Sequence, residues 1–114
     1  MRLGTETFFT HQLSRISKTK GSIKILDVGC GWGQHIADPE HHHFYGVDIE
    51  GFPKAMTLEK GYKEAREYAE NNAIYYNNDS FDVALLINVN AHLPDELLSS
   101  LLSEVAKKLK PKEP

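Results

Sequence analysis

The apolar residues of this 114-residue chain gather in short blocks, and three of these blocks have the composition of β-strands. Residues 22–28 and 44–49 are rich in β-branched and aromatic side chains and are bounded by glycine, histidine or proline. Residues 81–87 contain Val-Ala-Leu-Leu-Ile, which is apolar without alternation, as in a parallel strand covered on both faces. The pattern therefore predicts three strands.

Helical patterns fill much of the chain outside these strands. Apolar residues at helical spacing predict a helix over 5–18, and a second helix is predicted over 54–60. Residues 34–38 leave room only for a short helix, because Pro39 prevents its continuation. The clearest helix covers 94–110, where leucines recur every four residues, acids lie at the start and lysines at the end.

Strands that alternate with helices at these spacings predict an α/β fold, a small Rossmann-like, doubly wound parallel sheet with helices on both faces. No repeat or linker divides the chain, so residues 1–114 are expected to form one domain. The stretch 62–76 stays ambiguous, because residues 63–70 have helical composition whereas the fold requires a strand at the edge of the sheet.

Composition excludes several classes of protein. The chain is 40% hydrophobic and 25% charged, which is ordinary for a globular domain and excludes a disordered or collagen-like chain. A net charge of −3 argues against a nucleic-acid surface built on charge alone. No apolar run reaches the roughly 20 residues of a membrane span, and the first residues open no secretory signal. The single cysteine, Cys30, fits a reducing cytoplasm.

A glycine-rich turn follows the first predicted strand, in the segment Ile-Leu-Asp-Val-Gly-Cys-Gly-Trp-Gly over 25–33. Glycine allows positive φ and removes the Cβ that would block a ligand, and free N–H groups at a following helix start are expected to offer donors. The spacing is Gly-x-Gly-x-Gly, not the Gly-x-Gly-x-x-Gly of dinucleotide-binding turns. Asp48, at the end of the second strand, is expected beside this turn, where a carboxylate accepts ribose hydroxyls. The alternative is that Asp48 only caps the next turn.

Three blocks in order carry a family resemblance: LDVGCGWG, then YGVDI, then SFDVALLINVNAHLPDELLSSLLSEVAKKLKP. Together they resemble class I S-adenosylmethionine-dependent methyltransferases, over residues 20–111. The resemblance implies S-adenosylmethionine as the cofactor, and a methyl acceptor that the sequence does not identify. By resemblance, the cofactor-binding residues are Asp27 at the methionine amino group, Gly29, Gly31 and Gly33 shaping the pocket, Asp48 on the ribose, Ile49 on the adenine and the backbone at Asn88 at the methionine end.

The sequence departs from that family in two places. The acid expected after the third strand, which contacts the adenine, has only Tyr68-Ala69 or Glu70-Asn71 as counterparts. The family sheet has the order 3-2-1-4-5-7-6, and this chain reaches only the order 3-2-1-4, ending where the fifth strand would begin. We therefore expect weak or no turnover by this chain alone.

Two other functions compete with a methyltransferase, or the cofactor-binding part of one. The first is a non-catalytic remnant or fragment that acts as a partner module, and the second is a nicotinamide-dependent enzyme, which the glycine spacing disfavours. We also expect a homodimer formed through the exposed strand 81–87 or the last helix. The alternative is a monomer whose edge is covered by the N-terminal helix through Phe8 and Phe9.

Histidines are the remaining candidates for chemistry. His41, His42 and His43 are consecutive, so their side chains diverge; a solvated loop is expected there and no metal site. His92 follows the last strand, near the place of a methyl acceptor in the resembled family. It is a candidate general base, and the alternative is a residue that only stabilises its loop.

Overall fold

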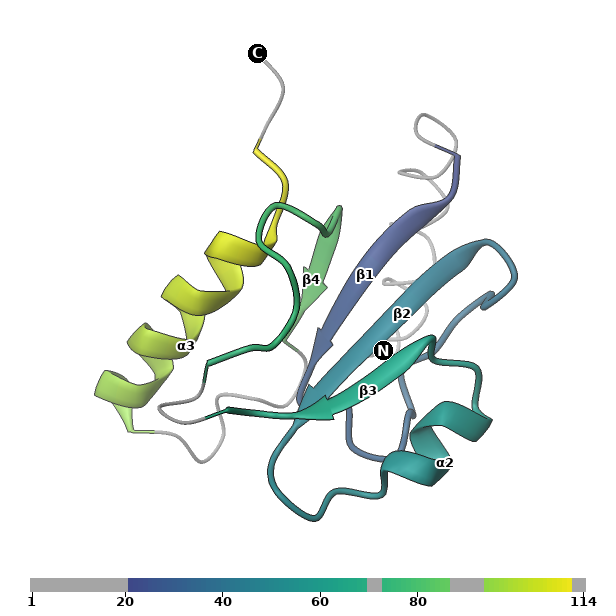
Figure 1. Cartoon of the computed structure of the whole chain (residues 1–114), viewed down its shortest axis with the longest axis horizontal. Coiled ribbons are helices and arrows are strands. Elements are labelled where there is room, and N and C mark those ends of the chain that lie inside the picture. The colour runs from purple at the N-terminus through teal and green to yellow at the C-terminus, as the bar shows by residue number, and fades with distance from the viewer. Residues whose placement is uncertain (1–20, 70–72, 87–93, 112–114) are drawn as a thin grey trace, which may run out of the picture.

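The protein is a parallel sheet with helices on both sides (Figure 1), and the computed structural model describes residues 21–69, 73–86 and 94–111. Its elements are, in chain order, β1 (Ile23–Val28), β2 (His42–Asp48), α2 (Lys54–Glu59), β3 (Glu64–Glu67), β4 (Val83–Leu85) and α3 (Asp95–Lys108). The strands lie in the order β3-β2-β1-β4, and every neighbouring pair is parallel. The predicted α/β fold and its strand order are confirmed.

The helices α2 and α3 and the strands β1, β2 and β4 lie where the pattern predicts them, with small differences at their ends. Strand β2 begins two residues earlier than expected, and β4 is shorter than the predicted 81–87. The helix predicted over 5–18 lies outside the described residues.

Residues 34–38 are not helical, so that prediction is wrong. The chain makes a turn over 31–35 and continues without regular structure to residue 38. Left-handed backbone at Gly33 (φ +90°) and Asp38 (φ +47°) brackets the segment and is incompatible with a right-handed helix. The glycine spacing and Pro39 together leave no stretch long enough for a helical nucleus.

The ambiguous stretch 62–76 contains the short edge strand β3. Residues 64–67 pair with β2 from Tyr45 to Asp48, and Ala65 is buried on the sheet. The helix-favouring composition of this stretch is overridden because the backbone of β2 offers it a row of hydrogen-bonding partners.

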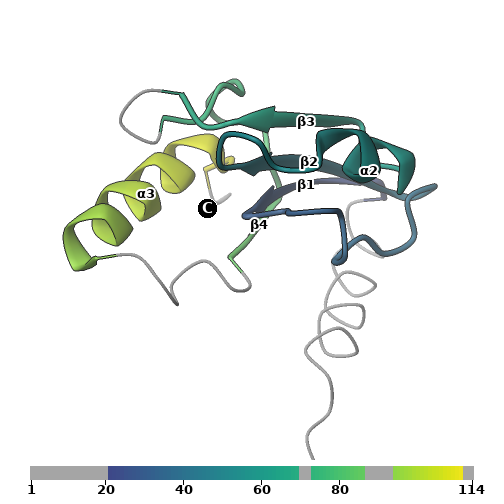
Figure 2. The same ribbon diagram turned by 90° about the horizontal axis from the view of Figure 1, so that it is seen from below.

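The core has two layers, one on each face of the sheet, and α2 and α3 lie on opposite sides of it (Figure 2). The strand residues Leu26, Val28 and Val47 pack against Leu101 and Val105 of α3. Alternate strand residues point to the other face, whose buried cluster comprises Ile23, Ile25, Cys30, Phe44, Tyr62 and Leu85. Buried side chains therefore cover both faces of the central strands.

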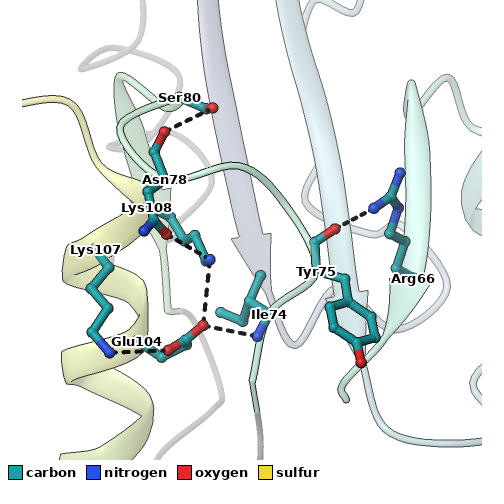
Figure 3. Close-up of polar contacts among 8 residues, drawn as sticks. All are labelled: Arg66, Ile74, Tyr75, Asn78, Ser80, Glu104, Lys107 and Lys108. Carbon is teal, nitrogen blue, oxygen red and sulfur yellow. Dashed lines mark hydrogen bonds and ion pairs between the residues drawn. The ribbon is translucent and has the colours of Figure 1, made fainter.

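The segment between β3 and β4 is tied to α3 by side-chain contacts (Figure 3). The Ile74 N–H donates to Glu104 Oε1 over 3.1 Å, and Lys108 Nζ donates to Asn78 Oδ1 over 2.8 Å. Lys108 Nζ also lies 3.4 Å from Glu104 Oε1. On the β3 side, the Arg66 guanidinium donates to the Tyr75 carbonyl oxygen. These contacts hold the segment across the face of the sheet that α3 covers.

The other edge of the sheet is β4. The chain after α3 returns to the start of this edge, where Leu109 forms a parallel bridge with Phe81 and the Lys110 N–H donates to the Phe81 carbonyl oxygen over 2.9 Å. Among the described residues, no other strand pairs with the outer side of β4. Within the same ranges, no helix is both long enough and apolar enough to cross a membrane.

Candidate functional site

The candidate site lies at the edge of the sheet where the parallel strands end. Strands β1 and β2 pair in register up to Val28 opposite Val47, so the turn after β1 and the last residue of β2, Asp48, come to the same place. Ligands of open parallel sheets bind at this edge, next to the point where the strand order reverses. Here the reversal falls between β1 and β4, because β2 and β4 lie on opposite sides of β1.

Asp48 is hydrogen-bonded to the glycine turn. The Gly31 N–H donates to its Oδ2 over 2.6 Å, and the Ile49 N–H donates to its Oδ1 over 2.7 Å. The carboxylate is half-buried and fixed by two backbone donors, yet each oxygen keeps a lone pair for a further donor. The structure thus places Asp48 beside the turn, and its Oδ1 also caps the chain that follows, as the alternative interpretation holds. Its contact with a ribose stays a prediction.

The expectation of free N–H donors at a helix start is wrong for this turn. The N–H groups of Gly29 and Cys30 donate to the Val47 carbonyl oxygen over 2.8 and 3.2 Å, and the Gly33 N–H donates to the Cys30 carbonyl oxygen over 2.9 Å. With Gly31 bonded to Asp48, four amides of the turn are used internally. No helix follows, so the turn lacks the dipole and the amide cluster that hold an anion.

The three glycines of the turn have different surroundings, although all have positive φ. A Cβ on Gly33 would lie 3.2 Å from the side chains of Lys60 and Tyr62, so this buried glycine lets α2 approach the turn. A Cβ on Gly31 would meet only Asp48 Oδ2, at 3.9 Å. Of these two glycines, Gly31 is therefore the one whose missing side chain leaves room beside the carboxylate.

Two residues that were not predicted from the sequence, Thr57 and Gly46, contact the glycine turn. The Thr57 hydroxyl of α2 is buried and donates to the Gly31 carbonyl oxygen over 2.5 Å. Gly46 of β2 lies against Cys30, since a Cβ there would be 2.6 Å from the Cys30 Sγ. The sequence offered one indication of the role of Thr57: it is a polar residue in the short helix that follows the second strand. Gly46, within a strand, indicated a close approach by another part of the chain.

Asp27 is fully buried near the end of β1. Its neighbours are Tyr62 and His35, which were not predicted as site residues from the sequence. Its Oδ2 accepts a hydrogen bond from the Tyr62 hydroxyl and lies 3.8 Å from His35 Nδ1. Asp27 Oδ1 and His35 Nδ1 have no hydrogen-bond partner among the described residues. A buried carboxylate with an unused oxygen is costly unless a donor completes it.

The carboxylates of Asp27 and Asp48 lie near Cys30. Burial, together with the nearby charges of Asp27 and Asp48, raises the pKa of the Cys30 thiol to about 12. The thiol therefore stays protonated and is a packing residue of the turn, not a nucleophile. The same two carboxylates favour a cationic ligand over an anionic one.

Ile49 follows Asp48 directly in the chain, and Tyr68 contacts Asp48 from the end of β3. Ile49 is 66% exposed and offers a free apolar surface next to the carboxylate. The Tyr68 N–H donates to the Asp48 carbonyl oxygen over 2.9 Å, which places the residue after β3 beside the site. Burial is the main cause that raises the Tyr68 pKa, and the charge of Asp48 adds to it. Tyr68 is thus a protonated neighbour of Asp48.

The remaining candidate residues are Asn88 and the histidines. Asn88 and His92 lie outside the described residues, so their predicted roles stay predictions. The solvated loop expected at the three histidines is wrong in part, because His42 and His43 belong to β2 and His42 is buried, while His41 is exposed and pairs with Asp38 at 3.0 Å. Across residues 21–69, 73–86 and 94–111, no three His, Cys, Asp or Glu side chains gather as a metal site would require.

Comparison with known proteins identifies what shares this arrangement. The profile of a family described as a methyltransferase domain matches residues 26–112. An S-adenosylmethionine-dependent methyltransferase from Methanosarcina mazei has a similar structure, with a TM-score of 0.65 and 23% identity over 79% of this chain. The YcgJ protein of Bacillus subtilis is similar with a TM-score of 0.62 and 25% identity over 88% of this chain.

A third similar structure is a TehB-like S-adenosylmethionine-dependent methyltransferase from Corynebacterium glutamicum, with a TM-score of 0.62 and 18% identity, covering 91% of this chain and 66% of its own. The matches cover 49% of the Methanosarcina protein and 46% of YcgJ, so this chain spans about half of their length. No curated protein matches the chain.

Proposed function

Because this chain belongs to the family of methyltransferase domains, we propose that the edge formed by the glycine turn and Asp48 binds S-adenosylmethionine, the cofactor that membership implies. The observation that carries the proposal is the pair of hydrogen bonds that fixes the Asp48 carboxylate beside Gly31. A carboxylate held in this way is preorganised to accept both hydroxyls of a ribose, and the missing Cβ of Gly31 leaves room for the sugar.

The other residues at this edge fit the parts of the cofactor. The exposed side chain of Ile49 next to Asp48 offers an apolar surface for the adenine. Asp27, with one unpartnered oxygen, supplies an acceptor for the methionine ammonium, and Gly29 and Gly33 shape the turn between the two acids. The backbone at Asn88 is proposed to complete the methionine end.

The charge of the site favours this cofactor over a nicotinamide dinucleotide. S-adenosylmethionine carries a sulfonium and an ammonium, which the carboxylates of Asp27 and Asp48 attract. The pyrophosphate of a dinucleotide needs free amides at a helix N-terminus, and here four turn amides donate within the protein.

When bound, the cofactor supplies an electrophilic methyl group for direct displacement by an acceptor nucleophile. The chain's own contribution is then to fix the cofactor's orientation through Asp48 and the glycine turn, which lowers the entropic part of the barrier. Any proton on the acceptor needs a base, and we retain His92 as the candidate. A methyl-transfer assay on pools of protein and small-molecule substrates would identify the acceptor and measure the turnover of this chain alone.

We further propose that residues 1–114 act as one cofactor-binding domain and work in the cytoplasm. A buried, protonated lone cysteine is compatible with that reducing compartment.

Titration calorimetry with S-adenosylhomocysteine, the demethylated cofactor, tests the proposed site. Wild-type chain should bind it and should not bind NAD. Asp48→Ala removes a charge-assisted pair of hydrogen bonds to the ribose and should weaken binding by about 2–4 kcal/mol.

The matched control is Glu50→Ala, which removes an exposed carboxylate two residues away and should leave the affinity within about twofold. Circular dichroism checks that both variants keep the wild-type fold. An unchanged affinity in Asp48→Ala would show that the ribose assignment is wrong.

A further inference from the structure

The environment of Asp27 is asymmetric. One oxygen, Oδ2, accepts a hydrogen bond from the Tyr62 hydroxyl, whereas Oδ1 accepts none from any described residue. The Asp27 side chain is fully buried and Tyr62 is 4% exposed, so water does not compete for this bond. Since the two oxygens of a free carboxylate are equivalent, the tyrosine decides which of them stays available.

His35 stands on the Oδ2 side as well. Its Nδ1 is 3.8 Å from that oxygen, beyond hydrogen-bond reach, and His35 is 7% exposed. The Tyr62 hydroxyl donates to Oδ2 and His35 lies on the same side of the carboxylate, and neither residue is hydrogen-bonded to Oδ1.

We propose that Tyr62 is a positioning residue: its hydroxyl holds the Asp27 carboxylate so that Oδ1 remains for the cationic amino-acid end of the cofactor. The inference rests on the proposed function of this site. Tyr62 is suited to the task because burial and the charge of Asp27 raise the pKa of its hydroxyl, which therefore remains a donor at any physiological pH.

Tyr62 also packs in the core, with its ring centroid 5.4 Å from that of Phe44 and its edge close to Gly33. A purely structural role would affect the whole site, whereas positioning of Asp27 affects only the part of the ligand that meets Asp27. Two ligands separate these cases. S-adenosylhomocysteine carries the amino-acid end, and 5′-methylthioadenosine keeps the adenosine and the sulfur but lacks it.

The experiment measures both affinities by calorimetry in wild-type chain and in Tyr62→Phe, which keeps the ring and removes the hydroxyl. We expect S-adenosylhomocysteine to bind about three- to tenfold more weakly and 5′-methylthioadenosine to change by less than about twofold. The matched control is Tyr76→Phe. Its hydroxyl donates to the Gly46 carbonyl oxygen over 2.8 Å on the other face of the sheet, so its loss should leave the ratio of the two affinities unchanged.

A double-mutant cycle with Asp27→Asn adds a second test, because it separates an effect of Tyr62 that passes through the Asp27 carboxylate from one that does not. In the Asp27→Asn background, Tyr62→Phe should cause no further selective weakening. Equal weakening of both ligands, no change in either, or an equally selective loss in the Asp27→Asn background would overturn the inference alone. Wild-type chain that binds neither ligand would overturn the proposed function and this inference with it.

Discussion

At the scale of the residue, the site depends on the hydrogen bonds and the backbone conformation of Gly31. Asp48 is held by backbone N–H groups, one of them that of Gly31, 17 positions earlier in the sequence, and Gly31 adopts a left-handed backbone that favours glycine. The carbonyl oxygen of the same residue accepts from Thr57. Gly31 is thus hydrogen-bonded at both its N–H and its carbonyl oxygen, which fixes its position and that of the Asp48 carboxylate.

Gly31→Ala and Gly21→Ala form a matched pair that separates backbone strain from crowding of the site. Both positions have left-handed φ, +53° and +75°, so each substitution should destabilise the chain by about 1–2 kcal/mol. Only Gly31 lies beside Asp48, whereas a Cβ on Gly21 meets nothing within 4 Å. S-adenosylhomocysteine should bind about tenfold or more weakly to Gly31→Ala and normally to Gly21→Ala. Equal affinities would contradict the placement of the ligand.

At the scale of the element, α3 serves both as a cover for the sheet and as an anchor for the segment between β3 and β4. Its apolar residues Leu101 and Val105 fill one face of the core, and its polar residues Glu104 and Lys108 hold Ile74 and Asn78 (Figure 3).

Glu104 should make the stability of this anchor depend on pH. The Ile74 N–H and, next among the favourable contacts, Lys108 hold the pKa of Glu104 below its ordinary value of 4.5. A lowered pKa in the folded state means that the ionised group stabilises the fold above the unfolded-state pKa, and that this stabilisation is lost as the pH falls through the folded-state pKa. Glu104→Gln should therefore lower the free energy of unfolding by about 1 kcal/mol at pH 7 and by less at pH 3.5.

Urea denaturation at the two pH values measures this difference, and Glu50→Gln, on an exposed residue, is the control that should show neither effect. A Glu104→Gln chain whose deficit in stability is as large at pH 3.5 as at pH 7 would show that the carboxylate charge has no part in the anchor.

At the scale of the whole molecule, the chain presents an open strand edge and exposed leucines on α3. The outer edge of β4 pairs with no other strand of the described ranges beyond the bridge at Phe81, and Leu97 and Leu102 of α3 are 43% and 44% exposed. We propose that a second copy of the chain covers β4 or α3, because paired strand edges and buried leucines each stabilise a two-fold dimer.

Light scattering at micromolar concentration should report a dimer. Leu102→Glu places a charge in the proposed interface and should raise the dimer dissociation constant about tenfold or more, whereas Leu58→Glu, at a residue of 43% exposure on α2, should leave it unchanged. Leu85 belongs to the core, so α3 gives the cleaner test. A wild-type chain that scatters as a monomer would exclude the dimer.

The sequence by itself determined the elements whose signals are local. The β-branched run before the glycines predicts β1, the leucine repeat predicts α3, and both are where they were expected, because periodicity and turn residues act over a few positions. The proximity of Asp48 to the glycine turn also followed, since parallel strands joined in a right-handed sense end at one edge. These features depend on the chain's own pattern and on general rules of sheet topology.

Only the tertiary structure decided the features that rest on distant partners. Residues 64–67 form a strand because β2 offers them hydrogen bonds, against their own helical composition. Residues 34–38 form no helix because the glycine turn and Asp38 use left-handed backbone to bring α2 against the turn. The hydrogen bond from Tyr62 to Asp27 joins residues 35 positions apart, and no local pattern encodes it. Such contacts are selected by the packing of the whole core, where a partner at any sequence distance competes with the local preference of the chain.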